Sequence, residues 1–198
     1  MPFQQFTYPQ VVGELGLGAA DRILHGDVAP ANLSDDLAKE LKDAASFGSI
    51  LGTEKARSEF GIAPVLWELR RRRPNQFGMF SGVELNADSS RGLNGVCDFV
   101  LTRPPQQHFL HAPLVAIMEA KNDNLRGGLG QCIAAMVAAR LLNHVEGQVD
   151  GPVNGVVTTG TQWKFLLLSD NVITVDLDEY YISEAAKIMG ILEYIIAS

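Results

Sequence analysis

The run from Leu114 to Lys121 places the strongest constraint on how this chain can fold. It opens with five apolar residues and closes with Glu119, Ala120 and Lys121. An apolar run of this length is typical of a strand that is buried on both faces. Because the side chains of a strand alternate between its faces, the carboxylate of Glu119 and the ammonium of Lys121 project from the same side. The run predicts a charged pair at the end of an otherwise buried strand.

A second strand, rich in β-branched and aromatic residues, is predicted over Val96–Thr102 and contains Asp98. The loop between the two strands, 103–113, holds three prolines, which exclude regular structure there. In an antiparallel hairpin closed by this loop, the numbers of opposed residues sum to about 216. That register puts Asp98 opposite Met118, with Glu119 one step along. We therefore expect two carboxylates and a lysine to meet at one place on a sheet.

The other patterns predict one α/β (α+β) domain with a mixed central β-sheet flanked by helices. The predicted elements, in order, are a helix from Glu54 to about Arg73 with a break near Gly61, strands at 80–88, 96–102 and 114–121, a long helix at 129–144, strands at 155–159, 163–168 and 172–177, and a closing helix at 183–196. This α-β-β-β-α-β order places the domain at 53–198. Residues 1–52 form an N-terminal extension packed on the core, in which 19–24 can make a turn or two of helix.

Several smaller features have two interpretations. Glycines at 127, 128 and 130 lack a phosphate-binding pattern and are interpreted as a loop ending in a helix start, which puts Gln131 in the first turn. Trp67 is assigned to the core, with base stacking as the second choice. Arg70–Arg73 form either a solvated helix end or a track for a phosphate backbone.

Composition limits the setting in which the chain acts. The formal net charge is −7, yet residues 51–150 carry 11 basic and 10 acidic side chains and are close to neutral. Weak, metal-dependent contact with nucleic acid is therefore expected in place of a strong basic footprint. No apolar run approaches the roughly 20 residues of a membrane span, and the first residues do not resemble a signal peptide. We expect a cytoplasmic protein that makes no membrane contact, with Cys97 and Cys132 as buried, reduced thiols.

The predicted constellation suits a divalent metal. Mg²⁺ or Mn²⁺ is commonly held by one or two carboxylates, together with water and substrate phosphate. Asp98 and Glu119, with the backbone carbonyl of Ala120, are the predicted ligands. Lys121 is placed to orient or acidify an attacking water, and Gln131 to hydrogen-bond that water or a phosphate oxygen. The alternative is a structural ion pair between a carboxylate and Lys121; the metal site is favoured because buried charges without a function are costly.

This arrangement resembles the PD-(D/E)XK phosphodiesterase superfamily, the fold of many restriction endonucleases and repair nucleases. The matching residues are Asp98, the triplet Glu119–Lys121, and Gln131, while Cys97 stands where the motif has proline. The resemblance covers about 53–170. It implies a restriction-endonuclease-like core in which Asp and Glu bind metal, Lys assists the attacking water and Gln supports the site.

The resemblance also implies a glutamate near the metal from the helix that precedes the sheet. Glu54 and Glu59 both qualify. Thr53 and Glu54, followed by Arg57, look like the first helix of the nuclease domain in type I restriction subunits. The spacing does not decide between the two glutamates.

The sequence thus predicts a Mg²⁺-dependent nuclease that acts on nucleic acid, with DNA as the expected substrate. Two alternatives stay open: a catalytically silent PD-(D/E)XK-like module that binds nucleic acid or protein, and a nuclease subunit active only within a larger complex. Because the chain has no evident recognition domain, a homodimer or a partner protein is expected to supply specificity.

Overall fold

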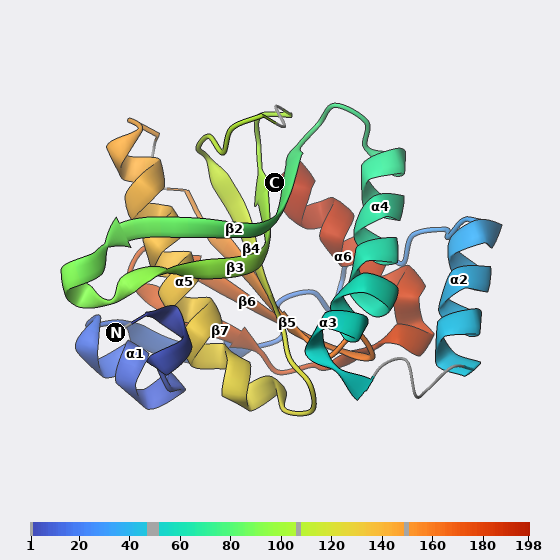
Figure 1. Cartoon of the computed structure of the whole chain (residues 1–198), viewed down its shortest axis with the longest axis horizontal. Helices are drawn as coiled ribbons and strands as arrows, with labels where there is room; N and C mark the ends of the chain where they lie inside the picture. The colour runs from blue at the N-terminus through green and yellow to red at the C-terminus, as the bar shows by residue number, and fades with distance from the viewer. Residues whose placement is uncertain (1, 47–51, 106–107, 149–150) are drawn as a thin grey trace.

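The computed structural model of the chain describes residues 2–46, 52–105, 108–148 and 151–198, in which one mixed sheet of eight strands packs against helices (Figure 1). The strands are β1 (Gly18–Arg22), β2 (Gly78–Asp88), β3 (Leu93–Thr102), β4 (Leu114–Ala120), β5 (Val153–Thr158), β6 (Gln162–Ser169), β7 (Val172–Asp176) and β8 (Tyr180–Tyr181). Their spatial order is β1-β7-β6-β5-β4-β3-β2, with β8 beside β6. The α/β prediction is confirmed.

Helices cover both faces of this sheet. They are α1 (Tyr8–Glu14), α2 (Asp35–Ser46), α3 (Glu54–Arg57), α4 (Ala63–Arg72), α5 (Leu125–Val145) and α6 (Ala185–Ala197), with short helical segments η1 (Phe3–Gln5), η3 (Ser58–Ile62), η4 (Ser89–Arg91) and η5 (Ile182–Glu184). One apolar core lies between the sheet and α5 with α1, and a second lies between the sheet and α4 with α6. The predicted order of helix, three strands, helix and further strands is confirmed.

The N-terminal segment is part of the sheet as well as packed on it. The helical turn predicted within 19–24 is wrong, because Gly18–Arg22 forms β1, an edge strand parallel to β7. The preceding η1 and α1 lie against α5. Residues from both ends of the chain therefore complete one edge of the sheet.

Helix α5 begins four residues earlier than the sequence predicts. Asn124 caps it by accepting the backbone N–H of Arg126 at 2.9 Å, so the glycines at 127, 128 and 130 are helical and do not form a loop. A Cβ on Gly130 would collide with the main chain of Phe6, and that close approach explains the glycine. By length and composition α5 could cross a membrane, but 67% of its most apolar stretch is buried, as expected of a core helix.

The helix that precedes β2 is interrupted, as the sequence predicts. Residues 58–62 form a π turn between α3 and α4, in which the N–H of Ala63 donates to the carbonyl of Ser58. Gly61 lies at this turn, and a Cβ there would come within 3.1 Å of the Cα of Gly160 in the β5–β6 turn. The assignment of Trp67 to the core is wrong, since its side chain is 57% exposed.

A bulge in β4 decides which residues of β3 and β4 share a face. Thr102 pairs with Leu114 as predicted, but Leu101 pairs with Ala116, so Val115 is an extra residue. Beyond it Phe99, and not Asp98, is opposite Met118. The predicted register was therefore wrong by one residue, and in a sheet such a shift exchanges the faces of every side chain. The observed register brings Asp98 level with Glu119.

Two buried asparagines satisfy the backbone of the bulge. The Asn143 side chain of α5 accepts the N–H of Leu114 at 2.7 Å and donates to its carbonyl at 3.0 Å. The amide of Asn154 donates to the carbonyl of Val115 at 3.3 Å. Since an unpaired buried backbone group is costly, these side chains stabilise the irregular register against a regular one.

We predict that Asn143→Ala lowers the free energy of unfolding by about 2–4 kcal/mol, because two buried backbone groups of Leu114 lose their partners. Urea unfolding followed by circular dichroism measures this change. Asn32→Ala, at an exposed loop position, is the control and should change stability by less than about 0.5 kcal/mol. Equal effects of the two substitutions would contradict the role given to Asn143.

Candidate active site

The carboxylate of Glu119 is the most unusual group in the protein. Glu119 lies near the end of the central strand β4 and its side chain is fully buried. Gln131 Nε2 donates to Glu119 Oε2 at 2.6 Å, whereas Oε1 has no hydrogen-bond partner among the described residues. A buried acceptor without a partner costs free energy, more so if it carries charge. The unpaired oxygen therefore marks a position where a cation or a donor belongs.

Asp98 is the second carboxylate at this place. Its Oδ2 accepts the backbone N–H of Ala120 at 2.7 Å, which ties β3 to the end of β4. Asp98 is half-buried, the register of β3 and β4 brings it level with Glu119, and its charge acts on that group. The expected meeting of the two carboxylates is present, although it arises from the bulged register and not from the one predicted.

The proximity of Asp98 and the burial of Glu119 act on proton affinity in the same direction. Burial, and then the negative charge of Asp98, raise the pKa of Glu119 well above its usual range. The ammonium of Lys121 lowers this pKa, whereas the charge of Glu54 raises it further. Paired acids of this kind either retain a proton or bind a cation.

Lys121 lies beside the carboxylates, held by α5 and α3. Its backbone N–H donates to the carbonyl of Thr158 at 2.8 Å, which extends the β4–β5 pairing by one residue. A Cβ on Gly128 would come within 2.9 Å of the Lys121 Cγ, so the glycine makes room for the lysine to lie across α5. Lys121 Nζ is 3.9 Å from Glu54 Oε1.

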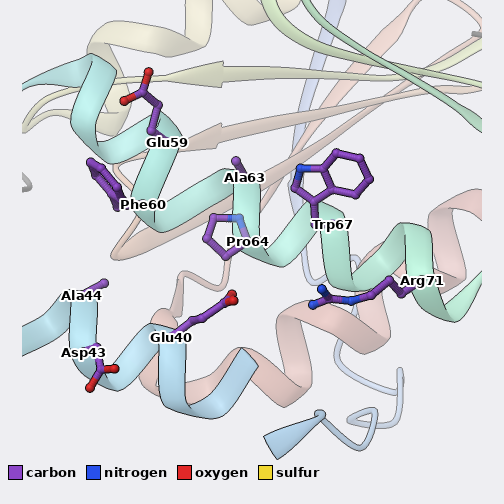
Figure 2. A pocket seen from close by; sticks show the side chains of 9 residues that line it. All are labelled: Glu40, Asp43, Ala44, Glu59, Phe60, Ala63, Pro64, Trp67 and Arg71. Atoms are coloured by element: carbon purple, nitrogen blue, oxygen red, sulfur yellow. The ribbon is translucent and has the colours of Figure 1, made fainter. Parts of the chain in front are cut away.

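Of the two candidate glutamates, the structure brings only Glu54 to this place. Glu59 is exposed and pairs with Lys55 at 3.8 Å, and Figure 2 shows its carboxylate directed away from α2. The π turn between them explains the separation, because it rotates the residues after Arg57 away from the direction of α3. Glu59 is therefore removed from the site.

Gln131 reaches Glu119, but not from the first turn of its helix. Because α5 begins at Leu125, Gln131 belongs to the second turn, and the predicted position was wrong. It is buried and directed at the carboxylate itself. Its contact partner is thus Glu119, whereas the sequence suggested a water molecule or a phosphate oxygen.

Arg57 is a site residue that was not selected from the sequence. Its Nη1 donates to the carbonyl of Thr159 at 3.0 Å and its Nη2 is 3.4 Å from Asp123 Oδ1, while Nε is buried without a partner among the described residues. The available signal was its spacing of three from Glu54, which puts both side chains on one face of a helix. The guanidinium of Arg57 thus lies between the turn that follows β5 and Asp123, on the same helix face as Glu54.

The remaining polar candidates lie elsewhere. Each of Arg70–Arg73 has an intramolecular partner: the Phe77 carbonyl, Glu68, and Glu193 for the last two. These four arginines are therefore bonded to other groups of the protein at the end of α4.

The thiols fit the expectation of buried, reduced cysteines. Cys97 and Cys132 are free and buried, and burial raises the pKa of both. Protonated thiols are poor metal ligands. Across the part of the chain that the structure describes, no three His, Cys, Asp or Glu side chains converge as a complete ligand set, so a cation here would rely on two carboxylates, backbone oxygen and water.

The described residues thus form a compact polar centre at the end of β4, next to α3 and the start of α5 (Figure 1). Comparison of the sequence with protein-family models, and with curated proteins, found no match. The chemistry of this centre therefore rests on its own geometry.

Proposed function

We propose that this protein is a Mg²⁺-dependent nuclease, able to use Mn²⁺ in its place, which hydrolyses phosphodiester bonds of nucleic acid, with DNA as the expected substrate. One observation carries the proposal: a buried carboxylate oxygen of Glu119 has no partner among the described residues, beside a second carboxylate and a lysine. The alternative of a structural ion pair would bring Lys121 Nζ to Asp98 or Glu119, whereas this Nζ lies 3.9 Å from Glu54 Oε1. The resemblance to PD-(D/E)XK nucleases supports the same assignment.

The residues divide into ligands and groups that act on water. Asp98, Glu119 and the carbonyl of Ala120 would hold the cation, which fits the unpaired Glu119 oxygen. When bound, the cation supplies positive charge that lowers the pKa of a water molecule and neutralises charge developing on the phosphate. Lys121 Nζ would donate a hydrogen bond to the attacking water and stabilise the hydroxide formed from it.

The surrounding groups fix these side chains in position. Gln131 holds one oxygen of Glu119 at 2.6 Å, leaving the other free. Glu54 attracts Lys121 from α3, and Arg57 supplies a second positive charge for the phosphate backbone. A complete set of Asp, Glu and Lys side chains at one place favours an enzyme over a silent binding module, since a silent module has no use for the uncompensated carboxylate.

We predict that Lys121→Ala leaves divalent-metal binding nearly intact and reduces cleavage by a factor on the order of 10² or more. Glu119→Gln should lose metal binding and cleavage together, because it removes a ligand charge. Calorimetric titration with Mg²⁺ and cleavage of end-labelled DNA measure the two effects. Cleavage by the parent protein that Lys121→Ala does not change would contradict the role of the lysine.

Glu54→Gln should reduce cleavage by roughly tenfold or more, since Lys121 then loses the charge that positions it. Glu59→Gln is the matched control, because it removes a glutamate from the same stretch of chain at an exposed position away from the site. Its cleavage rate should equal that of the parent protein. The opposite pattern would show that the wrong glutamate has been assigned to the site.

Without metal, Glu119→Gln should stabilise the protein at alkaline pH. The folded-state pKa of Glu119 is raised, so the free energy of unfolding of the parent falls as pH rises from the unfolded-state pKa through the folded one. Across that window the variant gains about 1.4 kcal/mol per pH unit over the parent. Near pH 4 the parent and the variant should respond to acid alike, and the variant should have no gain in stability over the parent.

Denaturant unfolding in a chelating buffer at several pH values tests this expectation. Addition of Mg²⁺ at pH 8 should then raise the stability of the parent and not of the variant, because only the folded parent binds the ion. Glu84→Gln, at an exposed position of β2, is the control for loss of one negative charge. A variant less stable than the parent at pH 8 without metal would show that Glu119 is paired in a way that stabilises the fold.

A further inference from the structure

The chain between β1 and α2 forms neither helix nor strand, and we call its residues 23–33 the strap. Of residues 21–36, all of which the structure describes, only His25 is buried. Three apolar side chains of the strap pack on the core but are only partly buried: Val28, Ala31 and Leu33. Segments with so few buried contacts open at lower cost than the core around them. The main anchor of the strap is therefore a titratable side chain.

The imidazole of His25 lies among aromatic rings and makes no hydrogen bond. Its centroid is 5.3 Å from that of Phe165 in β6 and 6.0 Å from that of Tyr194 in α6, both edge to face. Nδ1 and Nε2 are both buried without a partner among the described residues. A neutral imidazole tolerates such a place at moderate cost, whereas an imidazolium would be a buried charge with no bond to either N–H. The closed strap thus suits the neutral form of His25.

The charged groups near His25 do not offset that cost. The titratable groups that face it or act on it are Asp176 of β7, and Lys187 and Tyr194 of α6. Three donors already bond the Asp176 carboxylate, at 3.2, 3.1 and 3.2 Å: the N–H of Leu24, the N–H of Asp178 and the hydroxyl of Tyr180. Burial lowers the pKa of His25, the charge of Asp176 raises it, and the ammonium of Lys187 lowers it, with burial the largest influence.

The strap is bonded to α6 next to this histidine. The ammonium of Lys187 donates to three carbonyls of the strap, those of His25, Gly26 and Val28. The N–H of Ala31 donates to the carbonyl of Ala186 at 2.8 Å. A Cβ on Gly190 would lie 2.2 Å from the carbonyl oxygen of Ala29, so the two backbones are in direct contact. Because His25 supplies one of the carbonyls that Lys187 binds, movement of His25 disrupts the attachment to α6 as well.

Both ends of the strap are held by contacts that do not involve His25. At one end, the N–H of Leu177 donates to the carbonyl of Arg22 at 2.9 Å, next to the pairing of β1 with β7. At the other end, the hydroxyl of Ser34 donates to the buried carboxylate of Glu68 at 3.0 Å. The middle of the strap can therefore leave α6 while β1 and α2 keep their places.

We propose that the strap is a pH-sensitive element that opens in acid: protonation of His25 releases the middle of the strap from α6 and β7, while the rest of the fold stays intact. The imidazolium is then solvated by water in the open form. The proposal goes beyond the nuclease function and does not depend on it. In the order of the sheet, β5 and β6 separate β7 from the strand that carries Glu119, so the carboxylate centre is not part of this change.

The direction of the pH effect follows from proton binding. In the open strap His25 titrates near the value of an unfolded chain, about 6.5. In the closed strap its pKa is lower, so the closed form binds fewer protons. The equilibrium constant for opening is therefore steady above pH 7 and rises as pH falls below about 6.5, by up to tenfold per pH unit. The rise ends at the lowered pKa of the closed form.

Hydrogen exchange of the full chain, followed by mass spectrometry at pH 7.5, 6.5 and 5.5, measures this opening. The amides to follow are those of Leu24, Val28 and Ala31, which donate hydrogen bonds in the closed strap. After correction for the intrinsic effect of pH on exchange, their opening constant should increase about five- to tenfold between pH 7.5 and 5.5. Exchange in the buried part of α5, 132–139, should not change over the same range.

Three variants assign the effect. His25→Phe keeps an aromatic ring without a titratable group, and its strap should open to the same extent at all three pH values. His108→Gln, at an exposed loop position, is the matched control and should behave like the parent. Lys187→Met removes the bonds to the strap carbonyls, so it should increase opening at pH 7.5 by about tenfold or more while the rise in acid remains.

Four results would overturn the proposal. Strap exchange that does not depend on pH in the parent would show that His25 is not buried as a neutral group. A rise in acid that persists in His25→Phe would assign it to another residue. A parallel rise in α5 would mean that the whole fold opens and not the strap alone. Strap exchange that Lys187→Met leaves unchanged would show that α6 does not hold the strap closed.

Discussion

A carboxylate removed from water at the end of a central strand requires compensation, and much of this structure provides it for Glu119. Transfer of an isolated charge into a protein interior costs several kcal/mol even after relaxation. Gln131 compensates one oxygen, and the positive charge of Lys121 acts on the group from the next position of its own face. The second oxygen remains without compensation among the described residues. The fold thus keeps a destabilising group at the place where function is proposed, which is how active sites commonly differ from cores.

The position of that carboxylate depends on an irregularity near the other end of the same strand. Val115 is the second residue of β4, yet without the bulge there Asp98 and Glu119 would lie on opposite faces of the sheet. Asn143 and Asn154 play no catalytic part in this arrangement; they keep the polar backbone of the bulge bonded. Asn143, near the C-terminal end of α5, therefore supports a site that Gln131 contacts from near the N-terminal end of the same helix.

Sequence reasoning predicted the sheet class, the order of elements and the group of Asp98, Glu119 and Lys121, because strands and long helices have strong periodic patterns. It missed the bulge, since one additional residue leaves the apolar pattern of Leu114–Met118 unchanged. It also placed the start of α5 too late, because glycines at 127, 128 and 130 favour a loop locally. Tertiary contacts of Gly128 with Lys121, and of Gly130 with Phe6, override that local preference.

The exposure of Trp67 could not be predicted for a related reason. An apolar stripe at helical spacing indicates which side chains share a face, but not which face meets the sheet. Here Ile62, Val65 and Leu66 already fill the core side, and Phe60 and Trp67 are left outside. The identity of the glutamate near the site was likewise hidden, because a π turn leaves no periodic signature in so short a segment.

That π turn has a consequence for how sequences of this kind can change. A π turn contains about one residue more than an α turn, and each residue added to a helix rotates the remainder of that helix by about 100°. Loss of a single residue between Ser58 and Ile62 would join α3 and α4 into a regular helix. The new helix could aim Glu54 at Lys121, or Ile62 and Val65 at the core, but not both. The one extra residue of the π turn thus allows the side chains of α3 and those of α4 to point in directions that a single regular helix would not permit together.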